Sequence, residues 1–258
     1  MSMIYIPASV FGAGVSEQHN LAATVRSSGG DGLEFRRELF PPGELPLIAC
    51  REAVERERLH SVYSVPIELW KTTGELNEVG LLKALKEAQM LRPEMLKVSL
   101  GHFNRECKLE QVERLKQLLE DHRLQAGQFT LLIENDQTPY GGKAENLLFF
   151  FEAVTRYGLP GVKLTFDTGN WAYCGEDAFA AAEMLAPYVA YIHCKHVDSS
   201  TGTCITLPLP PEKDAPWRKL LKLLPDEVPR AIEFTLPPGE RLNYYVNLLR
   251  ERGEILCT

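Results

Sequence analysis

The chain alternates between two kinds of hydrophobic pattern from one end to the other. Short runs of β-branched, aromatic and aliphatic residues are bounded by glycine, proline or charged residues, which is typical of buried strands. Longer segments between them space their apolar residues three or four positions apart, which indicates amphipathic helices. The strand-like runs cover 3–10, 32–39, 60–67, 95–103, 129–135, 161–169, 189–197 and 230–236.

The helical pattern is clearest after the third and fourth of these runs. Residues 77–91 and 109–124 each carry an apolar stripe and an opposite charged face. The first stripe consists of Val79, Leu82, Leu85 and Met90 or Leu91, and the second of Leu109, Val112, Leu115, Leu118 and Leu119. Further amphipathic segments occupy 143–157, 176–187, 216–224 and 240–252.

Strict alternation of strands and helices predicts a parallel sheet with crossover helices, and eight repeats favour closure into a (β/α)8 TIM barrel. The length of 258 residues suits one such domain spanning 1–258. A doubly wound open sheet is the alternative. However, the segment "FGAGVS" lacks the full glycine spacing of a dinucleotide-binding turn, which weakens that alternative.

Composition narrows the setting and the partners. The net charge of −7 disfavours a nucleic-acid binder, which needs clustered Lys and Arg. The six cysteines form no CxxC pair, the N-terminus lacks signal-peptide features, and no apolar run reaches membrane-spanning length. We therefore expect a cytoplasmic protein that binds small molecules, without nucleic acid or membrane as a partner. Assembly into a homo-oligomer stays open.

Ionisable residues occur toward the ends of four successive late strands: Glu134, Asp167, His193 and Glu233. In a barrel these ends meet at the face that carries active sites. Three carboxylates and an imidazole would repel one another unless a cation balanced them, and they suit one divalent ion, Mn²⁺, Mg²⁺, Co²⁺ or Zn²⁺. Taken singly, each residue could instead cap a helix, form an ion pair or be a core histidine.

The order and spacing of these four residues resemble the xylose isomerase-like TIM barrels of the sugar phosphate isomerase and epimerase family, in particular the ketose 3-epimerase branch. The stretch "DGLEFRREL" is also similar to epimerases of bacterial ketogluconate utilisation. The resemblance implies that Glu134, Asp167, His193 and Glu233 are metal ligands. It further implies a manganese-type isomerase or epimerase of carbohydrate metabolism.

In the mechanism that this resemblance implies, the metal chelates a substrate carbonyl and an adjacent hydroxyl. Glu134 and Glu233 then remove and return a proton at one carbon of a ketose or keto-sugar acid. Asn170 stands where family members often have a histidine, and Ser199 where an arginine is common. Two alternatives therefore stay open: an inosose-type dehydratase, and a sugar-binding barrel without turnover.

Several neighbouring residues are candidates for substrate binding. Lys195 shares the inward face of its strand with His193, so it can bind a substrate oxygen or pair with an acid. We interpret Lys97 as a structural or wall-forming residue. Glu34, Arg36 and Glu38 alternate along the second strand, so one of them can line the cavity, and we expect Arg36 to pair with a glutamate. The other substrate-binding candidates are His102, Asn170, Trp171 and His196.

Overall fold

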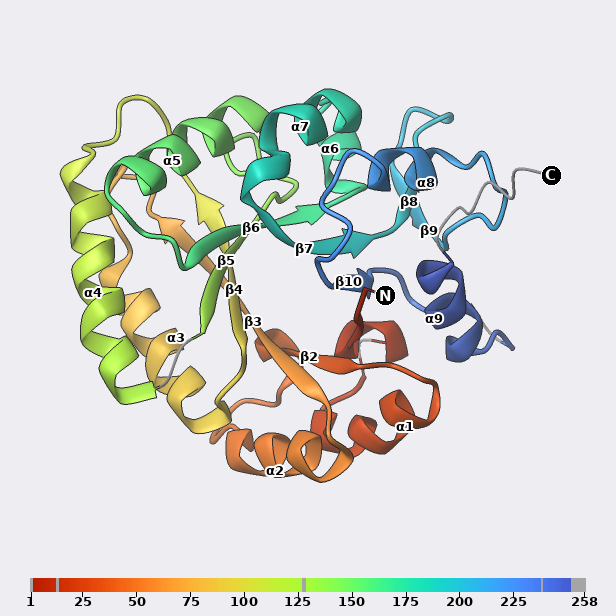
Figure 1. The fold of residues 1–258 in the computed structure, drawn as a ribbon. Helices are drawn as coiled ribbons and strands as arrows, with labels where there is room; N and C mark the ends of the chain where they lie inside the picture. Colours follow the sequence, from red (N-terminus) through yellow and green to blue (C-terminus); the bar gives the residue numbers. More distant parts are fainter. Residues whose placement is uncertain (1, 13, 127–128, 238, 252–258) are drawn as a thin grey trace.

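Eight parallel strands close into a barrel in a computed structural model that describes residues 2–12, 14–126, 129–237 and 239–251 (Figure 1). Around the barrel the order is β1-β10-β7-β6-β5-β4-β3-β2. Each of the eight predicted strands forms, and the (β/α)8 TIM barrel is confirmed; a single domain over 1–258 stays a prediction. The barrel strands are β1 (Ile4–Pro7), β2 (Gly32–Arg36), β3 (His60–Trp70), β4 (Met95–Gly101), β5 (Thr130–Glu134), β6 (Val162–Asp167), β7 (Val189–Cys194) and β10 (Arg230–Ile232).

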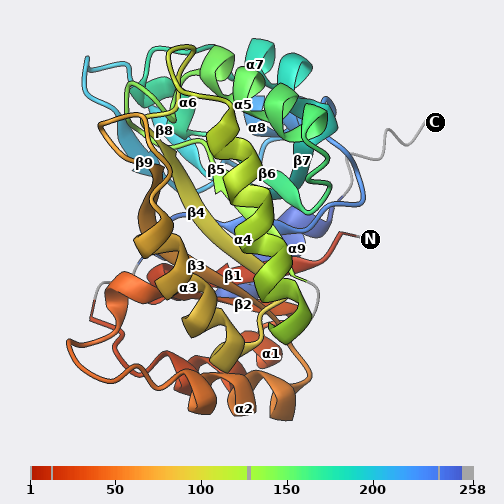
Figure 2. The same ribbon diagram turned by 90° about the vertical axis from the view of Figure 1, so that its left-hand side faces the viewer.

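Helices cover the outside of the barrel (Figures 1 and 2). All six predicted helical segments contain one, whereas the sequence pattern missed α1, α2 and the short α6. None of the helices in the described ranges combines the length and apolar character that crossing a membrane requires. The α-helices are α1 (Ala22–Ser27), α2 (Leu47–Glu57), α3 (Glu78–Leu91), α4 (Glu110–Ala126), α5 (Ala144–Arg156), α6 (Asn170–Tyr173), α7 (Ala178–Leu185), α8 (Pro216–Leu221) and α9 (Leu242–Arg250).

The buried face of α3 differs from the predicted one. Val79 is 78% exposed and Met90 is 42% exposed, so neither belongs to the core. The prediction counted only large apolar residues, whereas small alanines complete the true stripe at helical spacing. That stripe consists of Leu81, Ala84, Leu85, Ala88 and Leu91.

A two-stranded antiparallel sheet follows β7 and was not predicted. It pairs β8 (His196–Asp198) with β9 (Ile205–Leu207). The predicted strand 189–197 therefore ran too far, because β7 ends at Cys194. The following residues leave the barrel to form this hairpin.

The inside of the barrel has an apolar layer toward the N-terminal ends of the strands and a polar layer toward their C-terminal ends. The apolar layer is a small cluster, separate from the main core between strands and helices: Tyr5, Val62, Met95, Leu132, Tyr191 and Ala231. Residues two positions further along a strand point to the same side. Met95, Leu132, Tyr191 and Ala231 are followed at that distance by Lys97, Glu134, His193 and Glu233. Strand alternation thus places the charged side chains inside the barrel, directly next to the apolar layer.

Candidate metal centre

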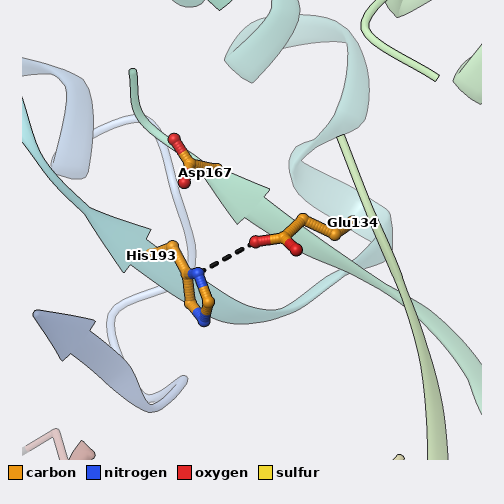
Figure 3. A group of neighbouring side chains, drawn as sticks. All are labelled: Glu134, Asp167 and His193. Carbon is orange, nitrogen blue, oxygen red and sulfur yellow. Dashed lines mark ion pairs between the residues drawn. The ribbon is translucent and has the colours of Figure 1, made fainter. Parts of the chain in front are cut away.

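Three of the four predicted metal ligands lie together at the carboxyl ends of β5, β6 and β7 (Figure 3). Glu134, Asp167 and His193 each offer one ligand atom, and these atoms lie within 4.8 Å of one another. Glu233 follows β10, and its Oε2 is 3.3 Å from His193 Nδ1. The structure therefore brings three of the predicted ligands within one ion's reach and places the fourth, Glu233, beside His193.

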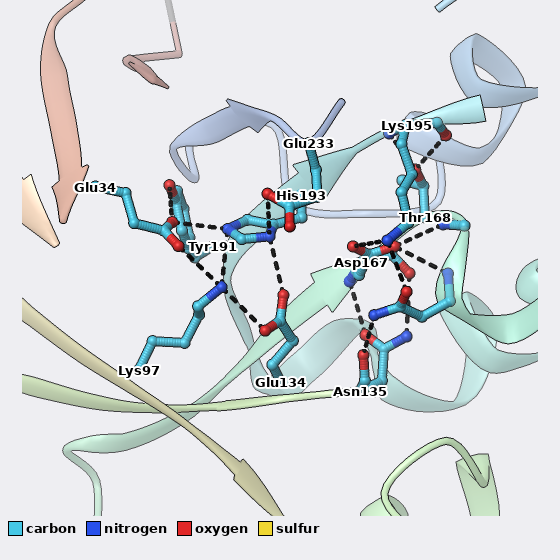
Figure 4. Close-up of polar contacts among 12 residues, drawn as sticks. Glu34, Lys97, Glu134, Asn135, Asp167, Thr168, Tyr191, His193, Lys195 and Glu233 are labelled. Carbon is cyan, nitrogen blue, oxygen red and sulfur yellow. Dashed lines mark hydrogen bonds and ion pairs between the residues drawn. The ribbon is translucent and has the colours of Figure 1, made fainter. Parts of the chain in front are cut away.

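Basic side chains hold one carboxylate oxygen of each glutamate; Figure 4 shows the contact of Lys97 with Glu134. Lys97 Nζ lies 2.9 Å from Glu134 Oε2, and Arg36 Nη1 lies 3.2 Å from Glu233 Oε1. Glu134 Oε1 and Glu233 Oε2 instead face His193 Nδ1, at 2.9 and 3.3 Å. Each glutamate thus has one anchored oxygen and one that faces the centre of the site.

Asp167 is anchored by the backbone that follows it. Its Oδ1 accepts hydrogen bonds from the amides of Gly169 (2.8 Å) and Asn170 (2.9 Å). Its Oδ2 is buried without a hydrogen bond of good geometry, although Lys195 Nζ lies 2.9 Å away. Asp167 therefore resembles the two glutamates: one of its oxygens is anchored by the backbone, and the other is not.

His193 is oriented by a buried carboxylate on β2. Glu34 Oε2 lies 2.8 Å from His193 Nε2 and also accepts a hydrogen bond from the Tyr191 hydroxyl at 3.0 Å. Lys97 Nζ lies 3.0 Å from Glu34 Oε1 and 3.4 Å from His193 Nε2. Contact with Glu34 favours a proton on Nε2, so that His193 in its neutral form would present the Nδ1 lone pair to a metal.

The charges of this centre are almost balanced by the protein itself. Each predicted acidic ligand has a basic partner: Lys97 for Glu134, Lys195 for Asp167 and Arg36 for Glu233. Side chains of the protein thus supply much of the positive charge that was expected to balance the three acids, so charge balance alone does not require a metal. The evidence for a metal lies instead in the candidate ligands themselves: Asp167 Oδ2, His193 Nδ1 and Glu233 Oε2 are among the buried atoms that have ion-pair contacts but no hydrogen bond.

The candidate ligands fit a divalent cation in type, and Glu134, Asp167 and His193 also fit it in position, with one ligand atom of each within 4.8 Å of the others. Carboxylate oxygens with one imidazole nitrogen form a donor set suited to Mn²⁺, Mg²⁺, Co²⁺ or Zn²⁺. Each donor residue is also anchored through its other polar atom, as metal ligands usually are.

The ion pairs shift the pKa values of this centre. Burial and Lys97 lower the pKa of His193, but the carboxylates of Glu34, Glu233 and Glu134 outweigh them and raise it to about 10. Burial opposes ionisation of Glu134, yet Lys97 and His193 hold its pKa well below the usual range. Burial raises the pKa of Asp167, because Lys195 compensates for it only in part.

A sequence model of the xylose isomerase-like TIM barrel family matches residues 22–238. The chain belongs to this family. No curated protein matches the sequence.

Solved structures that resemble this xylose isomerase-like barrel include enzymes and a zinc-bound protein. An L-ribulose 3-epimerase has 16% identity and a TM-score of 0.66, over 97% of this chain and 92% of that one. The probable 3-DHS dehydratase AsbF of Bacillus anthracis has 13% identity and a TM-score of 0.66, over 98% and 100%. The IolI protein with a bound zinc atom has 13% identity and a TM-score of 0.68, over 97% and 95%. At such low identity these likenesses establish the fold.

The candidate substrate-binding residues lie in different surroundings within this xylose isomerase-like barrel. Lys195 lies beside Asp167, and its ammonium donates a hydrogen bond to Asn170. His102 contacts Tyr140 with the two rings tilted and their centroids 4.1 Å apart, and both residues line a cavity of about 490 Å³. This cavity gives His102 access to a ligand.

The other two candidates are placed less favourably. Trp171 is fully buried and packs against Phe166, which leaves no face of its ring open to a sugar. His196 begins the β8–β9 hairpin, where it pairs with Leu207. It is partly exposed beyond the end of β7.

Sequence reasoning underestimated Lys97 and Glu34, which are both fully buried in the centre. Arg36 does pair with glutamates, as expected, but Glu233 of the candidate site is one of them. A signal was present, because Glu34 and Lys97 are charged residues inside otherwise apolar strands. Such charges are rarely buried unless they are paired.

Proposed function

We propose that this protein is a divalent-metal-dependent isomerase or epimerase that moves a proton at the carbon next to a carbonyl. The observation that carries the proposal is the placement of two carboxylates. Glu134 from β5 and Glu233 after β10 approach His193 Nδ1 to 2.9 and 3.3 Å. Their strands flank the β6–β7 pair in the barrel order. Two bases so arranged can serve the two sides of one substrate carbon.

Glu134, Asp167, His193 and Glu233 would hold the metal through the atoms that face the centre. A divalent ion bound there polarises a substrate carbonyl and acidifies the neighbouring C–H bond. Lys97 and Arg36 anchor one oxygen of each catalytic glutamate and keep both carboxylates ionised, which is the form that accepts a proton. The anchored bases then need no reorientation during the reaction.

The charges of the centre are compatible with a neutral ketose as well as with a keto-sugar acid. Three basic side chains, Arg36, Lys97 and Lys195, face the carboxylates of Glu34, Glu38, Glu134, Asp167 and Glu233. A divalent ion added to this set would bring it close to neutrality when His193 is neutral.

Exchange with deuterated water tests the proposal. The metal-stripped protein is incubated in D₂O with ketoses or keto-sugar acids, with and without added Mn²⁺, and the recovered sugars are analysed by mass spectrometry. We expect metal-dependent deuterium uptake at one carbon, and Glu233→Gln should reduce the rate by a factor of roughly 10² or more. Glu183→Gln on the exposed face of α7 is the matched control.

The outcome separates three functions. Deuterium in an epimerised or isomerised product supports the proposal, while an unsaturated product with new ultraviolet absorbance indicates a dehydratase. Dehydration is the second candidate because Lys195, 7% exposed beside Asp167, would supply the proton to a leaving hydroxide. If sugars bind without any exchange or product, the barrel is a binding protein.

A further inference from the structure

We infer that Lys195 competes with the metal for Asp167, and that Asn170 retains the lysine ammonium when the metal displaces it. The inference rests on the metal site of the proposed function. It assigns to Lys195 and Asn170 a role in setting metal affinity.

The position of Lys195 differs from that of the other basic residues. Lys97 and Arg36 contact the outer oxygens of Glu134 and Glu233, so each leaves a ligand atom open toward the centre. Lys195 Nζ instead lies 2.9 Å from Asp167 Oδ2. The other oxygen of Asp167 is already taken by two backbone amides, so Oδ2 is the atom left for a metal.

Asn170 provides a second partner for the same ammonium. Its Oδ1 accepts hydrogen bonds from Lys195 Nζ at 2.6 Å and from Gln137 Nε2 at 3.0 Å. Its Nδ2 donates to the backbone oxygen of Asn135 at 2.8 Å. These contacts fix which end of the amide faces the lysine. A neutral oxygen thus holds the ammonium beside the carboxylate.

The aliphatic part of Lys195 is confined, so the ammonium can shift but cannot leave. A Cβ atom at Gly169 would lie 2.7 Å from Lys195 Cγ, which shows how closely that backbone packs on the side chain. The Lys195 backbone amide also donates to Thr168 Oγ1 at 3.1 Å. Because an unpaired buried charge is costly, metal binding to Asp167 must leave Lys195 on Asn170 or on a substrate oxygen.

The test is a titration of the metal-stripped full chain with Mn²⁺ by calorimetry. Lys195→Met removes the competing charge and keeps most of the side-chain volume, so we expect Mn²⁺ to bind about tenfold tighter or more. Lys143→Met is the matched control, because Lys143 is ion-paired with Glu176 outside the candidate site. We expect no change in its Mn²⁺ affinity. If Lys195→Met does not fold, Lys195→Gln tests the same charge.

A double-mutant cycle tests the part played by Asn170. Asn170→Leu should weaken Mn²⁺ binding when Lys195 is present, because the displaced ammonium loses its neutral partner. In the Lys195→Met background the same change should have a much smaller effect. Equal effects in the two backgrounds would overturn the role of Asn170.

The outcomes also separate this inference from the proposed function. If the wild type binds Mn²⁺ and Lys195→Met binds it no tighter, competition is wrong while the metal site stands. If Lys195→Met gains binding that the wild type lacks, competition is supported. If neither protein binds Mn²⁺ at millimolar concentration, the metal site and the competition both fail.

Discussion

At the scale of single residues, Lys97 organises the centre of the barrel. Its side chain is fully buried, and its ammonium lies within about 3 Å of both Glu34 and Glu134. Burial alone would lower the pKa of Lys97, but these two carboxylates raise it. The charge is therefore retained inside the barrel, where it stabilises two carboxylates that would otherwise be unpaired.

Lys97→Met should strongly destabilise the metal-free protein. The change removes one partner of a buried ion pair, which costs about 3–5 kcal/mol because the remaining charges lose their compensation. Urea unfolding in the presence of a chelator measures the loss. Lys143→Met, whose ion pair with Glu176 is partly exposed, should lower the free energy of unfolding by about 1 kcal/mol or less. Equal stability of the two variants would show that Lys97 does not compensate these acids.

At the scale of elements, periodicity located strands better than helices. The barrel strands are compact apolar runs, and their pattern alone places all eight. The helix α2 escaped because its buried face, Leu47, Cys50, Ala53 and Val54, is made mostly of small residues among many charges. Helix packing against the barrel, rather than strong amphipathicity, stabilises it.

The same reasoning explains which parts of the site were predictable. Glu134, Asp167, His193 and Glu233 could be found because barrel strands direct their carboxyl ends to one face. Sequence also indicated that Lys195 can pair with an acid and that Arg36 pairs with a glutamate. It could not identify which acid each base holds, because ion pairs such as Arg36 with Glu233 join strands far apart in sequence.

The packing of α2 gives rise to a pH dependence. Burial raises the pKa of the Cys50 thiol to about 12, although a hydrogen bond with the His19 backbone opposes the shift. The same thiol in the unfolded chain ionises near pH 8.5, so ionisation stabilises the unfolded state at a lower pH than the folded state. The contribution of the protonated Cys50 thiol to the stability of the folded state is therefore fully present below that pH and is lost as the pH rises toward 12.

We therefore expect Cys50→Ala to flatten the alkaline loss of stability. Between pH 8 and pH 10.5 the free energy of unfolding of the wild type should fall by about 2 kcal/mol more than that of the variant. Urea unfolding at the two pH values measures this difference, and a variant that lacks only Cys204 is the control, because Cys204 is not buried. An identical pH dependence for Cys50→Ala and the wild type would contradict the assignment.

At the scale of the whole molecule, the barrel closes where the first strand meets the last. Within the part of the chain that the structure describes, the register of β1 against β10 consists of two residue pairs, Ile4 with Arg230 and Tyr5 with Ala231. Side chains reinforce this seam. Asp31 Oδ2 accepts a hydrogen bond from the Ile4 amide at 2.8 Å and forms an ion pair with Arg250 of α9 at 2.7 Å. The Asp31 carboxylate thus links β1 to α9.

Arg250→Met should loosen the closure without disturbing the candidate metal centre. The variant loses the contacts of Arg250 with Asp31 and with the Gly29 backbone oxygen, at 2.7 and 2.6 Å, so we expect a destabilisation of about 1 kcal/mol. Hydrogen exchange should show lower amide protection in β1 and α9. Arg56→Met, which removes an exposed arginine of α2, is the control. Protection that falls equally in β4 and β5 would mean that the whole barrel opens as one unit, with no weaker seam between β1 and β10.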